Sequence, residues 1–135
     1  MDPEGWREEY NFNVRFIDDQ HKYFFRTMNK LRDCINNGNC NVAGTEIFFE
    51  LAHYVEHFLI QEEIYFKDYQ FPNYKEHKEL HSDFIERFIQ FQKDFESKSE
   101  KVCTDMLAYL EEWFDNHILK YDKEAIEYLT ERGVE

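Results

Sequence analysis

The chain has 135 residues, of which 42% are hydrophobic and 33% charged, so it can bury a core and differs from a disordered tail. Aromatic residues make up 19%, while Gly and Pro together number six (4 and 2), which disfavours turn-rich sandwiches and barrels and favours long helices. The formal net charge of −13 disfavours binding to nucleic acid or to an anionic membrane surface.

The chain contains no apolar run near the roughly 20 residues that cross a bilayer, and its acidic first ten residues lack the pattern of a secretory signal. Cys34, Cys40 and Cys103 are an odd number without the spacing of a metal site. We therefore expect a cytoplasmic protein with free thiols. The alternative is a Cys34–Cys40 disulfide.

Apolar residues recur every three or four positions in four stretches, which predicts helices at about 17–37, 43–69, 74–96 and 101–131. Short polar loops and the Phe71-Pro72 step separate these stretches. Short loops favour antiparallel neighbours, so the expected fold is all-α, an antiparallel up-down-up-down four-helix bundle. Residues 1–16 form an N-terminal arm of the same single domain, 1–135.

Histidines occupy positions where a plain helical bundle would have Leu or Ile. His21, His77, His81 and His117 lie on the apolar stripes of three of the predicted helices, and His57 flanks the stripe of the remaining one. A single inward His is usually a core residue with a hydrogen-bond partner, but five from four helices would face one another. Neutral imidazole binds iron, copper or zinc well, so the pattern predicts a metal site.

Two carboxylates complete the pattern, because Glu62 follows His57 by five residues and Asp122 follows His117 by five. Five residues turn a side chain away from the original face of a regular helix, so each carboxylate would have to reach sideways. If both carboxylates bridge two six-coordinate metals, then five imidazoles and one bridging oxygen fill all positions except one. Such a centre would accept one small ligand.

These residues resemble the hemerythrin family. The matching stretches are IDDQHK (17–22), YVEHF (54–58) with EE (62–63), FP (71–72), HKELH (77–81) with Phe84, and WFDNHILKYD (113–122). The resemblance implies two non-haem iron ions with an oxo or hydroxo bridge, which bind dioxygen reversibly. It also implies that His77, His81 and His117 hold one iron, that His21 and His57 hold the other, and that Asp122 and a glutamate bridge them.

The glutamate departs from the family spacing, His-Phe-x-x-Glu, which would put it at position 61, where this chain has Gln61. The spacing downstream of Glu62 is that of the family, so we infer one inserted residue between His57 and Glu62. A single-turn π-bulge would absorb the insertion and return Glu62 to the inner face. The alternative is a regular helix with Gln61 inward and an altered or mononuclear centre. The charge that a bridge needs favours Glu62.

The ligand pocket is expected to be lined by Phe58, Trp113, Phe114 and Ile118, which also suit ordinary core packing. His53 is interpreted as a surface or supporting residue, and Glu63 as facing solvent. The resemblance favours an oxygen-binding protein for storage, delivery or sensing over an enzyme. The alternatives are a diiron enzyme acting on peroxide or nitric oxide, and an iron store or sensor. The oligomeric state stays open, and a monomer is compatible with the sequence.

Overall fold

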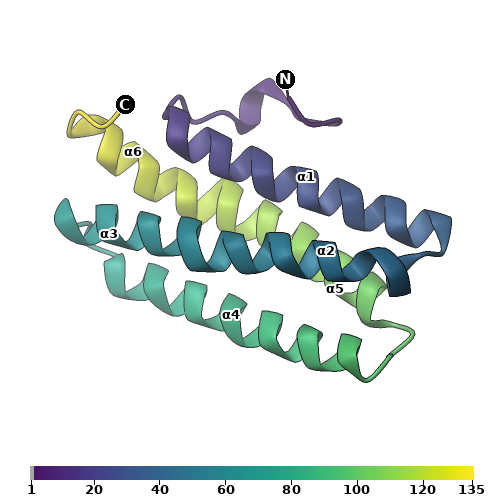
Figure 1. Ribbon diagram of the computed structural model, residues 1–135. Helices are drawn as coiled ribbons and strands as arrows, with labels where there is room; N and C mark the ends of the chain where they lie inside the picture. The colour runs from purple at the N-terminus through teal and green to yellow at the C-terminus, as the bar shows by residue number, and fades with distance from the viewer. Residues whose placement is uncertain (1) are drawn as a thin grey trace.

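The structure, a computed structural model that describes residues 2–135, is all-helical and has no strand within that range. Four continuous rods occupy the stretches in which the sequence predicts helices (Figure 1). The first rod is α1 (Arg15–Asn37) and the third is α4 (Tyr74–Glu96). The second rod consists of α2 (Cys40–His53), a π-helix (Tyr54–Leu59) and α3 (Ile60–Asp68). The fourth consists of α5 (Val102–Trp113), a π-helix (Phe114–Asp122) and α6 (Lys123–Glu131).

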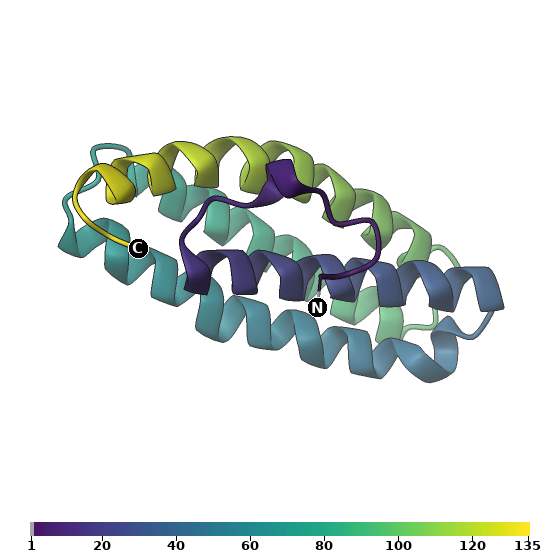
Figure 2. The ribbon, with the colours of Figure 1, turned by 90° about the horizontal axis from the view of Figure 1, so that it is seen from above.

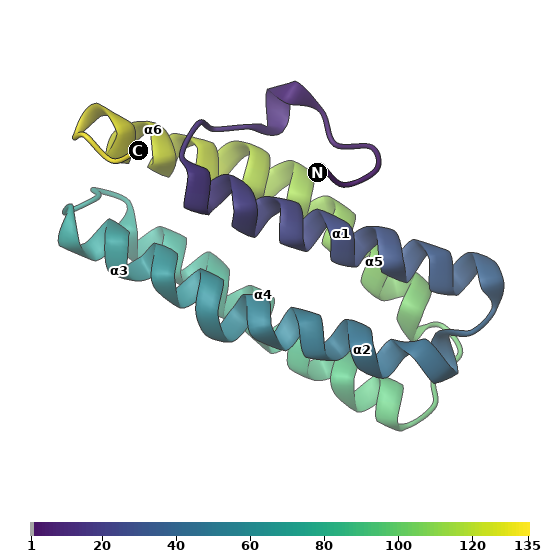
Figure 3. The same cartoon turned by 45° about the horizontal axis from the view of Figure 1, so that its top comes forward.

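The rods lie side by side in a helical bundle, as Figures 1 and 3 show from two directions. Contacts join α1 to α2 and α5, and join α4 to α3 and α5. Local sequence ends each rod. Gly38 closes α1 in the left-handed region at φ 68°, where its N–H is bonded to the carbonyls of Cys34 and Ile35. Pro72 lies in the loop between α3 and α4.

Aromatic and aliphatic side chains fill the interior between the rods. The larger buried cluster includes Phe24, Leu51, Phe84 and Met106, and a smaller one gathers Phe66 and the side chains around it near the chain ends. These clusters leave a polar layer between them, because His21, Glu62 and Asp122 are buried but belong to neither.

The segment before α1 lies across the outside of α1 and the fourth rod (Figure 2). It contains a short 3-10 turn, η1 (Glu8–Tyr10), and two of its aromatic rings pack against the bundle. Trp6 and Tyr10 contact the ring of Phe114 edge-on, with centroids 6.2 and 5.1 Å away. This contact fixes the segment over one face of the fourth rod.

Each π-helix changes which residues of its rod face inward. Along the second rod the fully or nearly buried positions are Leu51, Tyr54, Leu59, Glu62 and Phe66. The steps between them are three or four residues, as in a regular helix, except for the step of five between Tyr54 and Leu59. That step coincides with the π-helix, whose wider turn repeats after more residues.

The three cysteines are free thiols, so the alternative Cys34–Cys40 disulfide is not formed. None of the helices in residues 2–135 is both long enough and apolar enough to span a membrane.

Leu31→Ala should destabilise the bundle by about 2–5 kcal/mol, because Leu31 is fully buried in the larger core cluster and its loss leaves a cavity. Urea denaturation followed by circular dichroism measures the change in unfolding free energy. Val42→Ala is the matched control, since Val42 lies on α2 with 83% of its surface exposed. The control should change stability by less than about 0.5 kcal/mol. Equal effects of the two substitutions would contradict this packing.

Candidate metal centre

Five buried side chains from three rods converge in the polar layer. Each offers one possible ligand atom, and these atoms all lie within 4.8 Å of one another. Glu62 comes from α3, His77 and His81 from α4, and His117 and Asp122 from the π-helix of the fourth rod. The arrangement brings imidazole and carboxylate donors to one point in the bundle, as a transition-metal site requires.

Three imidazoles form one side of this centre. His81 Nε2 lies 3.2 Å from His117 Nε2. One oxygen of each carboxylate faces the same side, since Asp122 Oδ1 is 2.8 Å from His77 Nε2 and Glu62 Oε1 is 3.5 Å from His81 Nε2. We call His77, His81 and His117 with these two oxygens the three-imidazole side.

The remaining carboxylate oxygens face a fourth imidazole from α1. His21 Nε2 lies 3.2 Å from Asp122 Oδ2 and 3.8 Å from Glu62 Oε2, and all three side chains are fully buried. We call this the His21 side. Both carboxylates therefore have one oxygen toward each side.

Several polar atoms of the centre have no hydrogen-bond partner within residues 2–135, although they are buried. They include both oxygens of Glu62, whose nearest ring nitrogens are 3.5 Å (His81) and 3.8 Å (His21) away. Leaving buried carboxylate oxygens without a partner costs free energy, and coordination to a cation would remove that cost. The donor set and its orphaned atoms therefore fit a bound metal.

The charges of the centre are strongly coupled. Burial alone would lower the pKa of His21, but the hydrogen bond with Asp122 and the nearby Glu62 carboxylate outweigh burial and raise the pKa from 6.5 to about 9. Burial and the nearby Asp122 charge raise the pKa of Glu62. Burial would also raise the pKa of Asp122, yet the rings of His117, His21 and His77 hold it well below 3.8. Without metal, a proton on His21 thus balances the ionised Asp122.

Glu62, and not Gln61, faces the centre. Glu62 is fully buried, whereas Gln61 is exposed and its Oε1 accepts a hydrogen bond from Gln20 Nε2 at 2.6 Å. The reason is the wide turn of the π-helix, which rotates the following residues so that position 62 takes the inner face. The expected π-bulge is therefore present, but it includes His57 instead of following it.

His57 is not brought to the centre, contrary to the expectation from the sequence. Its side chain is exposed, and its ring lies against that of His53 with centroids 4.4 Å apart. The physical reason is its place within the wide turn, between the inward residues Tyr54 and Leu59, so that it points away from the bundle axis. Of the seven expected ligand residues, the structure gathers the other six.

The second π-helix explains how His117 and Asp122 share a face although they are five residues apart. Both are buried, and His117 Nε2 lies 3.1 Å from Asp122 Oδ1. A π-helix returns to the same face after about five residues, so no sideways reach is needed. The spacing of five between these residues was the signal in the sequence for this helix.

Glu63 supports the centre and was missed by sequence reasoning, which placed it in solvent. Its Oε2 is 2.9 Å from His81 Nδ1, and its side chain is only 17% exposed. A carboxylate on the outer ring nitrogen fixes the orientation of a ligand imidazole and raises its basicity. Local sequence carries no signal for this contact, because 18 residues separate the pair.

The four expected pocket residues have different surroundings. Trp113 stacks on His117, with ring centroids 3.8 Å apart and planes 10° apart, and Ile118 is fully buried. The ring contacts of Phe114 are with Trp6, Tyr10 and Phe25, whereas Phe58 contacts Tyr23, His53 and Tyr54. Trp113 is thus the pocket residue in ring contact with an imidazole of the centre.

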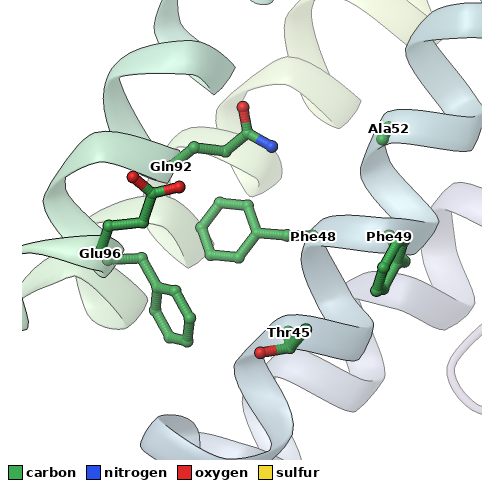
Figure 4. Close-up of a pocket in the computed structure, with 7 residues that line it drawn as sticks. Thr45, Phe48, Phe49, Ala52, Gln92 and Glu96 are labelled. Carbon is green, nitrogen blue, oxygen red and sulfur yellow. The ribbon is translucent and has the colours of Figure 1, made fainter.

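An apolar hollow of about 300 Å³ lies elsewhere, between α2 and the C-terminal end of α4. Phe48 points from α2 toward α4 there, next to Gln92 and Glu96 (Figure 4). No His or Cys lines it, and His77 and His81 lie near the opposite end of α4. The hollow is separate from the candidate metal centre.

Comparison with known proteins gives a consistent result. The family model described as the hemerythrin HHE cation binding domain matches residues 13–129. A bacteriohemerythrin of Methylococcus capsulatus is 34% identical over 116 residues, which cover 85% of this chain and 87% of that protein. A bacteriohemerythrin of Pseudomonas aeruginosa is 30% identical over 87% of this chain and 75% of its own length. A myohemerythrin of Theromyzon tessulatum is 25% identical, covering 87% of this chain and 86% of its own.

Glu62→Gln should prevent binding of a metal pair, because a neutral amide of the same size cannot bridge two cations as a carboxylate does. We expect at most one Co(II) per chain, measured by elemental analysis after loading and gel filtration. Gln61→Ala should leave the metal content unchanged, since Gln61 is exposed and turned to Gln20. The opposite pattern, with Gln61→Ala losing metal, would refute this register.

Without metal, the protein should lose stability as the pH rises. The folded-state pKa of His21 is raised to about 9 from 6.5, so its contribution is fully present below pH 6.5 and is lost as the pH passes 9. The loss should reach up to about 3 kcal/mol. Urea denaturation of chelator-treated protein at several pH values measures it. His21→Asn should remove the part of this pH dependence that comes from His21, while the raised pKa values of His77 and Glu62 leave the rest; a variant that keeps it in full would rule out His21 as a source.

Proposed function

Because the chain belongs to the hemerythrin family, we propose that it is a non-haem diiron protein that binds dioxygen reversibly. The observation that carries the proposal is the orientation of the two carboxylates. Each has one oxygen toward the three imidazoles and the other toward His21. Such a division suits two cations held side by side with two bridging ligands. Imidazole and carboxylate together suit iron.

Bound iron would supply the electrons and the coordination position for dioxygen. His77, His81 and His117 would hold one ion on the three-imidazole side, and His21 would hold the other. Glu62 and Asp122 would bridge the pair, and their two negative charges would offset part of the charge of the cations. Glu63 would keep the ring of His81 oriented through its 2.9 Å contact with Nδ1.

Buried aromatic side chains form a wall beside the centre. Trp113 covers the ring of His117 and donates its indole N–H to the hydroxyl of Tyr54 at 3.1 Å. Tyr54 is fully buried, and burial raises the pKa of its hydroxyl well above 10, so it stays protonated. An apolar wall of this kind keeps water away from the centre, which favours reversible binding over turnover of the bound ligand.

The wider expectations belong to this same proposal. We take the bundle to be the antiparallel up-down-up-down fold, with the N-terminal segment as an arm on it and 1–135 as one domain. The acidic surface suits a cytoplasmic protein without a nucleic-acid or membrane partner, and storage, delivery and sensing of oxygen all suit the centre.

Anaerobic loading with Fe(II) should give two irons per chain and a colourless protein. Admission of air should produce a visible absorption band that disappears when oxygen is removed and returns on a second exposure. Optical spectroscopy with iron analysis measures both. Irreversible bleaching accompanied by turnover of peroxide would favour a diiron enzyme instead, and an unchanged spectrum in air would contradict oxygen binding.

A further inference from the structure

The two sides of the centre offer unequal numbers of protein donors. The three-imidazole side has three ring nitrogens with Glu62 Oε1 and Asp122 Oδ1. The His21 side has one ring nitrogen with Glu62 Oε2 and Asp122 Oδ2. The three-imidazole side therefore has five donors and the His21 side has three. The donor missing from the His21 side is the imidazole expected from His57.

A change of side-chain rotamer would not bring His57 inward. Tyr54 and Leu59, on either side of it along the wide turn, are both fully buried, so position 57 faces the opposite direction. Rotating the rod to turn His57 inward would move Tyr54 out of the core and break its hydrogen bond with Trp113. It would also displace Glu62, which continues the same inner face.

The exposed ring of His57 is also held on the outer surface by its neighbours. Its ring centroid lies 4.4 Å from that of His53, four residues earlier. The ring of His53 in turn lies against that of Tyr23 of α1, with centroids 5.5 Å apart. Phe58, the next residue, packs edge-on against the ring of Tyr23 at 5.1 Å. These aromatic contacts favour the outward placement of position 57.

We propose, on the basis of the diiron function above, that the metal on the His21 side is bound through one imidazole and two bridging carboxylates only. With a bridging oxygen from solvent, a six-coordinate ion there has two positions left for exogenous ligands instead of one. The centre therefore binds its second ion more weakly than its first, and it accepts two small anions or one that coordinates through two atoms.

Co(II) titration of the metal-free chain tests this assignment, with calorimetry for affinity and proton NMR for the ligands. Each imidazole on Co(II) gives a strongly shifted ring N–H signal in water, so the spectrum counts the bound histidines. Three variants are compared with the wild type: His57→Ala, His21→Ala, and His53→Ala as the matched exposed control. Circular dichroism verifies that each one folds.

We expect two Co(II) per wild-type chain, four shifted ring signals, and saturation by azide at two anions. His57→Ala and His53→Ala should change the affinity for the second ion by less than about twofold. His21→Ala should weaken the second ion by at least about tenfold while the first ion is retained.

Loss of the second ion in His57→Ala to the same extent as in His21→Ala would overturn the proposal, as would a fifth shifted signal that His57→Ala removes. Saturation at one azide would refute the second open position. A wild-type chain that binds fewer than two ions gives a different result, because it would refute the dinuclear function itself.

Discussion

The structure depends on the burial of two carboxylates, Glu62 and Asp122, at a point where all four rods meet. Neither side chain reaches solvent, and the groups around them are imidazoles from α1, α4 and the fourth rod. Buried negative charge is costly unless it is paired or bound to a cation. A cation that neutralised this pair would link the rods to one another, so its binding would stabilise the bundle.

Most of the helical architecture, and the convergence of six of the seven expected ligand residues, could be predicted from the sequence, because both depend on local periodicity. The spacing of apolar residues marks the rods, and imidazoles on those stripes must turn inward with them. The choice of Glu62 over Gln61 rested on charge, and Glu62 is the buried residue of the two. The five-residue spacing of His117 and Asp122 was visible, although its helical explanation was not.

The placement of His57 could not be predicted, because it depends on where the second rod widens. An inserted residue can be absorbed before, at or after a histidine, and each choice leaves the loops unchanged. In this structure Tyr54 is held inward by the hydrogen bond from Trp113, and the wide turn that begins at Tyr54 includes position 57. The contact of Glu63 with His81 is likewise tertiary, and no pattern within either helix indicates it.

The wide turn around His57 has a consequence for how such a protein changes over generations. Gain or loss of one codon within this turn can be absorbed by widening or narrowing the turn, so that the residues beyond it keep their faces while those within it rotate. The loops at both ends keep their places, so the fold survives while a different side chain is presented to the interior. A single insertion or deletion can thus exchange one ligand residue for another while the fold stays the same.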